Sequence, residues 1–590
     1  MSSILARSGL PGVPRSSYQG GNLAVAMRAL VSRIGAAGVL SLALAIVVAI
    51  TMVVLLFPLT SDMPAWDQWT IVPIFEAHYS GRPVLPLLLA PYNGHYNCLP
   101  RFLLYRMGVL SRWDTRLEAL MGFGWAACTL GLLLRMLWES SPRLLILAAP
   151  FAAWVFSALQ FQNFLNGFGM GQLLAEFAAI LALYLLTDPE AGRWRFGLAL
   201  LCAAAAFLSH GAGLAVAPAG LVGLLLVGRR PNWVRIGAWS LVTGFGAVLG
   251  LLGGRSMQLV MHWRRVPAFA LALVGRPFTF DLAPSPARTA ALGAFVIVVL
   301  GAVIAWAIWR DRAAKRDLLA RWGCVALLAL GVAGLVAMSH SAAPLDLSLS
   351  SHYVTSTYPV GLALLVLIVD RLQASASAVT GGRRWLPGLA VLACCVAPLA
   401  QQAMAAYRIV PMLRSWKTVG DRMSRRVVLG TATDQEIGQA VHTNPDDVRS
   451  AVPFLRSHRL AWFAHAPEAR LPFGELDSVA GLQPASTVTL RQGTPWVFEG
   501  WAVPPLLALD TPIEAALVVD GVSVVGARPG GLRPDQEAYY RSRSFLTSGF
   551  ALVAPDGERR PPGRYRVSVV LRSPQPTVTL RKLELVVLPR

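Results

Sequence analysis

The stretch AGVLSLALAIVVAITMVVLLF, residues 37–57, contains no charged side chain and is followed directly by a polar segment. A helix rises about 1.5 Å per residue, so roughly 20 apolar residues cross a hydrocarbon core of about 30 Å. The stretch begins too deep in the chain for a cleavable signal peptide, and no small-residue cleavage site follows it. It therefore predicts a signal anchor, preceded by a disordered cytoplasmic tail over residues 1–30.

Apolar stretches of similar length recur as far as residue 407. Of the 590 residues, 55% are hydrophobic and 14% are charged, which is far from the average of soluble proteins. Further helices are expected at about 116–137, 144–160, 170–187, 196–209, 212–228, 233–253, 288–309, 319–338, 353–370 and 385–406, eleven with the first. The sequence therefore predicts a polytopic α-helical membrane domain over residues 31–407, embedded in the lipid bilayer.

Positive charges indicate which side of the membrane each connection faces. GRRPNWVR, residues 228–235, contains three arginines, whereas the loops at about 161–169, 210–212 and 339–352 contain neither Lys nor Arg. The positive-inside rule then predicts a multi-pass protein with a cytoplasmic N-terminus, and an odd number of helices puts the C-terminal region outside. The long outward loops 58–115 and 254–287 do contain arginines, which indicates anionic contacts or only that long loops translocate whatever their charge.

The residues after 407 have a different pattern. Residues 408–480 are expected to form an amphipathic helical connector. From residue 481 the apolar period becomes two, as in YRVSVVLR, residues 565–572, and Asp520-Gly521 and Asp556-Gly557 are turn dipeptides. An extracytoplasmic all-β sandwich is therefore predicted over residues 481–590. The net charge of +21 does not indicate nucleic acid, because no Lys/Arg cluster alternates with stacking aromatic residues.

Polar side chains gather at the outer ends of the predicted helices. They are Asp62, Asp67, Glu76, His95, Gln162, Asn163, Asn166, His210, His262, Arg264, Arg265, His340 and His352. Ionisable groups near membrane depth are costly and usually functional, so the set predicts a site at the outer boundary. Each residue taken singly is also explained as a loop residue that faces water.

The residue types in this set point to proton transfer and phosphate binding. A partly desolvated carboxylate is suited to act as a general base on a sugar hydroxyl or to hold a cation, while arginines neutralise a phosphate leaving group. Trp66 is explained equally by interface anchoring and by sugar contact, and Glu76 by the dipole of a short helix that begins near Pro73. No Cys or His pair has the spacing of metal ligands, so no metal site is predicted.

Five segments resemble a known superfamily. They are WDQWTIVPIFEAHYSG (66–81), YNGHYNCLPRFLLYRM (92–107), FQNFLNGFGMGQ (161–172), FLSHGAGLAVAP (207–218) and SHYVTSTYPVG (351–361). Together they resemble the GT-C superfamily of integral-membrane glycosyltransferases, and more closely a bacterial group of GT-C-like proteins, over most of residues 37–407. The C-terminal region looks like a β-sandwich often appended to bacterial glycosyltransferases, either carbohydrate-binding or a packing module.

The resemblance implies a polyprenyl-phosphate-linked sugar as donor and a catalytic aspartate at Asp67, with Asp62 as the substitute. It also places His95 and Arg101 in one motif segment and His210 in a Ser-His-Gly turn. Two departures are visible. Many GT-C members have paired acids where this chain has Asp67-Gln68, and relatives tend to have Ser-Arg-Tyr where it has Ser-His352-Tyr.

We therefore expect transfer of a sugar from a lipid-linked donor to a cell-envelope glycan or glycolipid on the extracytoplasmic side. Asp67 is expected to be the base, and Arg264 and Arg265 to hold the donor phosphate. The other expected site residues are Trp66, Glu76, His95, Arg101, Gln162, Asn163, His210 and His352. The sequence assigns no cofactor with certainty, and a divalent cation is compatible with the site. The resemblance to a bacterial group implies the bacterial inner membrane as the location. The alternatives are an envelope polysaccharide polymerase or ligase, and a non-enzymatic transporter or assembly protein for lipid-linked glycans.

Overall fold

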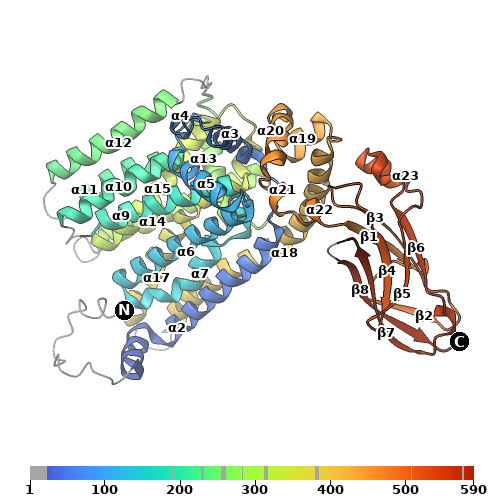
Figure 1. Cartoon of the computed structure of the whole chain (residues 1–590). Helices are drawn as coiled ribbons and strands as arrows, with labels where there is room; N and C mark the ends of the chain where they lie inside the picture. The colour runs from blue at the N-terminus through green and yellow to red at the C-terminus, as the bar shows by residue number, and fades with distance from the viewer. Residues whose placement is uncertain are drawn as a thin grey trace.

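The computed structural model describes residues 23–92, 94–188, 192–227, 232–253, 261–281, 283–310, 316–378, 385–506, 508–574 and 577–590. A helical bundle forms one part of the molecule, and a β domain lies beyond one end of it (Figure 1). Most of the predicted N-terminal tail lies outside the described residues. Residues 23–30, which were expected in that tail, already belong to helix α2 (Leu23–Leu56).

Among the described residues, nine helical stretches are long and apolar enough to cross a membrane. They are Ile34–Leu59, Thr115–Ser140, Pro142–Leu165, Gly167–Leu186, Trp233–Gly253, Pro286–Trp309, Asp317–His340, Ser351–Ser375 and Trp385–Leu429. The two other predicted spans correspond to shorter helical segments, α10 (Arg193–Ser209) and Gly211–Leu226. Sequence and structure therefore agree on where the apolar segments lie: α10 begins three residues before the predicted 196–209, and Gly211–Leu226 ends two residues before the predicted 228.

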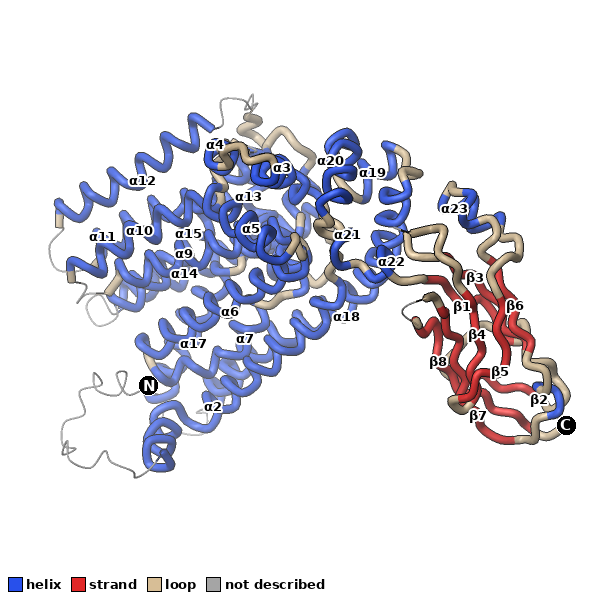
Figure 2. Tube along the Cα trace, in the orientation of Figure 1, coloured by secondary structure: helices blue, strands red, loops and turns tan. Residues whose placement is uncertain are grey.

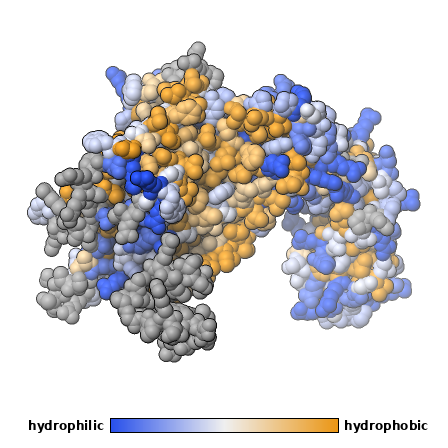
Figure 3. Space-filling view, turned by 60° about the vertical axis from the view of Figure 1, so that its left-hand side comes forward, coloured by the Kyte–Doolittle hydropathy of each residue, from blue (hydrophilic) through white to orange (hydrophobic). Residues whose placement is uncertain are grey.

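The helices of the bundle differ in how much of their apolar surface is buried inside the protein. They are α6 (Thr115–Ser140), α7 (Ala148–Val155), α8 (Phe161–Leu165), α9 (Met170–Leu186), α11 (Val216–Leu226), α12 (Trp233–Gly253), α14 (Pro286–Arg310), α15 (Arg316–His340), α16 (Val354–Thr357), α17 (Pro359–Ala378) and α18 (Trp385–Leu429). The stretch containing α7 and α8 is almost wholly buried, whereas α12 and α14 expose large apolar side chains such as Leu241 and Val298. Figure 3 shows a broad hydrophobic face over the bundle and a mostly hydrophilic β domain.

The second long loop contains a helix that the sequence analysis did not predict. Helix α13 (Val266–Gly275) packs along α14. Gly275 and Gly293 lie at the crossing, where an added Cβ would stand 1.9 Å from the Thr289 and Leu271 carbonyl oxygens respectively. Backbones this close require glycine, so residues 266–275 form a packed helix within the segment that was expected to be a long loop.

The first loop and the connector form one hydrophobic layer at an end of the bundle. The loop consists of η3 (Trp66–Ile71), α3 (Val72–Tyr79), α4 (Leu85–Leu89) and α5 (Cys98–Ser111), and the connector of α19 (Asp434–Ala440), α20 (Pro445–His458), α21 (Trp462–His465) and α22 (Pro467–Arg470). Phe75 and Trp113 from the loop share a core with Leu455 from the connector and Trp501 from the β domain. Burial of that shared core fixes the layer to the end of the bundle.

The C-terminal domain has two sheets, as predicted for a sandwich (Figure 2). One sheet has the order β1 (Phe473–Val479), β3 (Val497–Val503), β6 (Gly549–Val553); the other has β2 (Thr487–Arg491), β8 (Val578–Leu588), β7 (Gly563–Arg572), β4 (Glu514–Val519), β5 (Val522–Ala527). Helix α23 (Pro534–Tyr540) lies between β5 and β6. Strands β2 and β8 are parallel, and the other pairs are antiparallel.

Both predicted turn dipeptides of this domain lie in turns, but the two turns differ in form. Asp520 and Gly521 have φ of 50° and 85° and close the β4–β5 hairpin. Asp556-Gly557 instead enters a 3-10 turn on the path between the two sheets. Strand β1 begins at Phe473, inside the segment predicted to be helical, because it pairs with β3 along its whole length. Such pairing is decided by a distant strand and not by local periodicity.

Candidate functional site

The segment that contains Asp67 is held by hydrogen bonds with four parts of the chain, which contribute Val441, Asn166, Tyr92 and Glu118. The first two bind its beginning. Trp66 has a left-handed backbone (φ 53°), and its N–H donates to the Val441 carbonyl of the connector at 2.6 Å. The Ala65 carbonyl accepts a hydrogen bond of 3.1 Å from the Asn166 side chain, which follows α8. A left-handed conformation is uncommon for tryptophan, so these contacts define the start of η3.

Asp67 itself is half-buried and keeps one carboxylate oxygen available. Its Oδ1 accepts a 2.8 Å hydrogen bond from the Tyr92 hydroxyl, while its carbonyl accepts from the Thr70 hydroxyl at 2.6 Å. Among the described residues, no hydrogen bond or ion pair to Oδ2 is formed. The carboxylate therefore has a fixed direction without being neutralised by a cation.

Arg101 was expected in the site, and the structure assigns it to the loop backbone. The buried guanidinium donates to the carbonyls of Leu87 and Ala90, at 3.3 and 2.8 Å, and lies 5.3 Å from the centre of the Tyr92 ring. Burial lowers the pKa of Arg101. The Tyr92 ring also packs edge-on against Phe168. Arg101 thus supports the tyrosine that contacts Asp67.

Gln68, which follows Asp67 directly, is bound to a buried glutamate that the sequence analysis did not select. Its amide nitrogen donates to Glu118 Oε2 at 2.6 Å, and the Trp113 indole N–H donates to Oε1 at 2.9 Å. Glu118 is only 1% exposed. A sequence signal did exist, because Glu118 is an ionisable residue inside a predicted membrane span.

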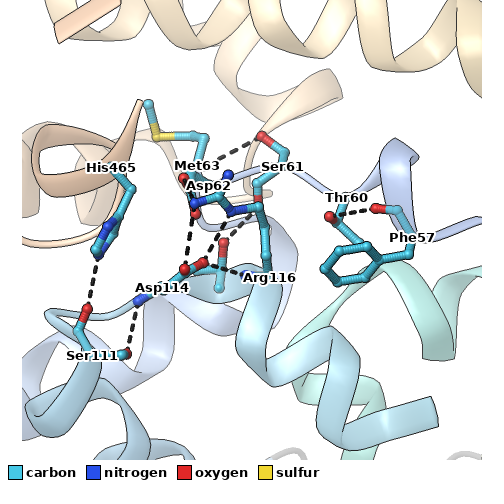
Figure 4. Close-up of polar contacts among 10 residues, drawn as sticks. Phe57, Thr60, Ser61, Asp62, Met63, Ser111, Asp114, Arg116 and His465 are labelled. Carbon is cyan, nitrogen blue, oxygen red and sulfur yellow. Dashed lines mark hydrogen bonds and ion pairs between the residues drawn. The ribbon is translucent and has the colours of Figure 1, made fainter. Parts of the chain in front are cut away.

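Asp62 belongs to a different group of charges, shown in Figure 4. Its carboxylate accepts from Arg116 at 3.1 Å, and the same guanidinium lies 3.1 Å from Asp114. Burial, together with the hydrogen bond to Asp114 and the charge of that neighbour, raises the pKa of Asp62 to about 7. The carboxyl is therefore held in an ion-paired cluster, which argues against Asp62 as the substitute for Asp67.

A second set of predicted residues converges at the ends of α8, α9, α10 and α16. The rings of His95 and His210 are 4.9 Å apart, and His210 Nδ1 accepts from the Ala212 N–H at 3.1 Å. The Nε2 atom of His210 lies 3.5 Å from the Gln172 amide. Burial, and the nearby rings of His95 and His352, lower the pKa of His210 well below its usual range. His210 is therefore neutral at physiological pH.

Asn163 continues this set as a buried hub. The two hydrogens of its amide nitrogen are shared among three acceptors: Gln172 Oε1 at 2.9 Å, the His352 carbonyl at 2.9 Å and Thr355 Oγ1 at 2.6 Å. The exposed Gln162 contacts His352 through Oε1 and ring Nδ1, 3.2 Å apart. The structure thus brings together His95, Gln162, Asn163, His210 and His352, and adds Gln172 and Thr355, which have no local sequence signal.

The remaining predicted residues are not brought into contact with these groups. Trp66 is 46% exposed, and Glu76 lies on α3 without a described side-chain hydrogen bond. Arg264 and Arg265 are exposed at the start of α13. Their segment is attached to the residue that follows His340, since the His262 N–H donates to Ser341 Oγ at 2.9 Å. Neither arginine forms an ion pair with a described residue.

The space around the histidines is small. A cavity of about 10 Å³ is lined by His95, Tyr96, Phe207 and Gly211 among others, which is room for about one water molecule. Within the described ranges, no group of three or more His, Cys, Asp or Glu side chains is arranged to hold a metal ion. Position 68 is a glutamine whose amide nitrogen is bound to Glu118, so it supplies no second carboxylate beside Asp67.

Comparison with known proteins found no match from which a function could be taken. No protein-family model matches the chain, and no curated protein or solved structure matches it either. The functional conclusion therefore depends on the residues and their geometry.

Proposed function

We propose that the chain is an inner-membrane glycosyltransferase that moves a sugar from a polyprenyl-phosphate-linked donor to a cell-envelope glycan or glycolipid outside the cytoplasm. The observation that carries the proposal is Asp67, a half-buried carboxylate in a rigid segment that directly follows an apolar, membrane-length helix. The proposed fold is a GT-C-like bundle of eleven spans with the N-terminus in the cytoplasm and the β domain outside.

The proposed chemistry uses the free side of the Asp67 carboxylate. Oδ2 takes the proton of the acceptor hydroxyl as that oxygen bonds to the anomeric carbon, and the bond from that carbon to the donor phosphate oxygen breaks. The leaving lipid phosphate takes the electron pair, and exposed arginines stabilise its charge. Arg264 and Arg265 suit that role, because no described carboxylate neutralises them. Neutral His210 and the exposed amide of Gln162 offer hydrogen bonds to sugar hydroxyls, and the buried amide of Asn163 holds the segment that carries Gln162.

The test is to delete the gene and rescue the strain with the intact gene or with Asp67→Asn. Envelope glycans and lipid-linked sugars are profiled by mass spectrometry at matched membrane levels. We expect the intact gene to restore a missing sugar and Asp67→Asn to let the donor accumulate. Asp346→Asn is the matched control, since Asp346 is an exposed acid in a 3-10 turn without a described partner. Full rescue by Asp67→Asn would remove Asp67 from the mechanism.

Transport of a lipid-linked glycan is the second candidate, and one buried residue favours it. Glu176 on α9 is 7% exposed and hydrogen-bonds to Tyr358, deep in the bundle. Ionisable residues in such positions often line transport pathways. An in vitro reaction with the purified protein separates the candidates, because a transferase forms a glycosidic bond from the lipid-linked donor and a transporter does not. A polymerase or ligase would show an intact oligosaccharide, not a single sugar, accumulating on its lipid.

A further inference from the structure

Glu118 has a structural relation to Asp67 that the proposed reaction does not use. It lies in the first turns of α6, is 1% exposed, and receives hydrogen bonds from Gln68 and Trp113 on its two oxygens. No described lysine or arginine forms an ion pair with it. A buried carboxyl is costly unless hydrogen bonds satisfy it, so the two donors account for its presence there.

Gln68 transmits this anchor to the beginning of η3. Its Oε1 accepts from the Ala65 N–H at 3.1 Å, while its amide nitrogen donates to Glu118. The carbonyl of the same Ala65 residue is bound by Asn166. The peptide groups on both sides of Ala65 are therefore fixed from one direction by α6 and from another by the segment after α8. Asp67 follows two residues later and adjoins Gln68 directly.

Gly167 provides the space that this arrangement needs. A Cβ added at Gly167 would stand 2.0 Å from Glu118 Oε2 and 2.5 Å from its Cβ. Contacts below about 3 Å force a shift, and here the atoms in the way belong to a buried side chain with two hydrogen bonds. An alanine at position 167 would thus move the Glu118 carboxyl without removing any polar group.

We propose that Glu118 is a positioning residue, which through Gln68 sets the direction of the Asp67 carboxylate toward the acceptor hydroxyl. This inference rests on the proposed role of Asp67 as the base. An amide at position 68 fits this positioning role, because the observed bond needs an N–H donor at 68 and a carboxyl acceptor at 118. A second carboxyl at position 68 could bind Glu118 only by sharing a proton with it.

The exchange of these two groups gives a sharp test. In Gln68→Glu/Glu118→Gln, the Ala65 N–H still meets a carboxyl oxygen, the amide at 118 donates back to position 68, and the Trp113 N–H meets the amide oxygen. Every hydrogen bond has a counterpart. In Glu118→Gln alone two amide nitrogens compete, and in Gln68→Glu alone two carboxylates face each other.

The intact protein, the two single variants, the exchanged pair and Gly167→Ala are purified in detergent at matched folded amounts. Each is assayed for transfer from a polyprenyl-phosphate sugar to an envelope glycan extract. Each single variant should lower the maximum rate by about tenfold, the worth of one buried hydrogen bond, with little change in acceptor KM. The exchanged pair should recover most of the rate. Gly167→Ala, which keeps both polar groups, should lower the maximum rate in the same way.

The outcomes separate the two proposals. If Asp67→Asn is inactive, two results would overturn the positioning role alone. They are full maximum rates in both single variants, or a maximum rate in the exchanged pair no higher than in the single variants. An active Asp67→Asn protein would reject the base assignment and the positioning role together. A raised acceptor KM together with a lowered maximum rate and lowered thermal stability in every variant would show that Glu118 supports only the fold.

Discussion

Asp62 and Asp67 are five residues apart, follow the same apolar helix, and have opposite surroundings. Asp62 is 8% exposed and shares Arg116 with Asp114, whereas Asp67 is half-buried and contacts only a neutral hydroxyl through its side chain among the described residues. A carboxylate that is paired and buried contributes to the fold. One that is oriented but not neutralised remains available for proton transfer, which is why the proposal uses Asp67.

The largest contrast is expected in activity. Asp67→Asn should reduce sugar transfer by about 100-fold or more, because a general base contributes that much to such reactions. Asp62→Asn should stay within about threefold of the intact protein, since its amide still donates to Asp114. Transfer assays on the purified variants measure both. Equal losses in the two variants would contradict the separation of the two acids.

The same contrast applies to the adjacent amides. Asn163→Ala should lower the free energy of unfolding by about 1–3 kcal/mol, because it removes the two N–H groups that three neighbouring oxygen atoms share. Gln162 is exposed, so Gln162→Ala should change the free energy of unfolding by less than about 0.5 kcal/mol. Thermal or denaturant unfolding in detergent provides the comparison. Similar values for the two variants would show that Asn163 is not a structural hub.

The arginine that bridges the Asp62 cluster should matter for stability and not for transfer. Arg116→Gln should cost about 1–2 kcal/mol, less than a fully buried pair because the Arg116 side chain is partly exposed. Arg564→Gln removes an exposed pair with Glu584 and serves as the control, with an expected cost near 0–1 kcal/mol. Differential scanning of the purified proteins measures both, and a specific loss of transfer rate in Arg116→Gln would contradict the assignment.

The last contrast is a pH dependence of stability. The folded pKa of Asp62, about 7, is above its unfolded value of 3.8, so the folded state holds an extra proton between those pH values. Stability from Asp62 therefore falls as pH rises from about 4 to about 7 and then levels off. The pKa of Asp114 is lowered, which acts in the opposite direction only below about pH 4.

Asp62→Asn cannot titrate, so it should lose that fall in stability. The melting temperature of the intact protein should drop relative to this variant by about 2–4 °C for each kcal/mol involved. Melting curves between pH 4.5 and 8 for both proteins test the expectation. Parallel curves would mean that Asp62 keeps its ordinary pKa in the folded protein.

Local pattern was sufficient for part of the candidate site. The acids and amides after the first helix, the Ser-His-Gly turn and the amide segment 162–166 were selected because polar side chains in apolar surroundings are costly. It was insufficient for the partners of these residues. Tyr92, Gln172 and Thr355 look like ordinary loop or helix residues in sequence, and their roles depend on which distant atoms they meet.

By itself, the sequence determined the positions of the apolar helices, the change to a period of two in the β domain, and the polar character of one end of the bundle. Hydrophobic length and periodicity are properties of adjacent residues, so one chain is enough to read them. Only the tertiary structure decided that α13 is packed, that β1 is a strand, and that Asp62 is ion-paired while Asp67 is available. Those outcomes depend on contacts between residues far apart in the chain, such as Gln68 with Glu118, and no local pattern encodes them.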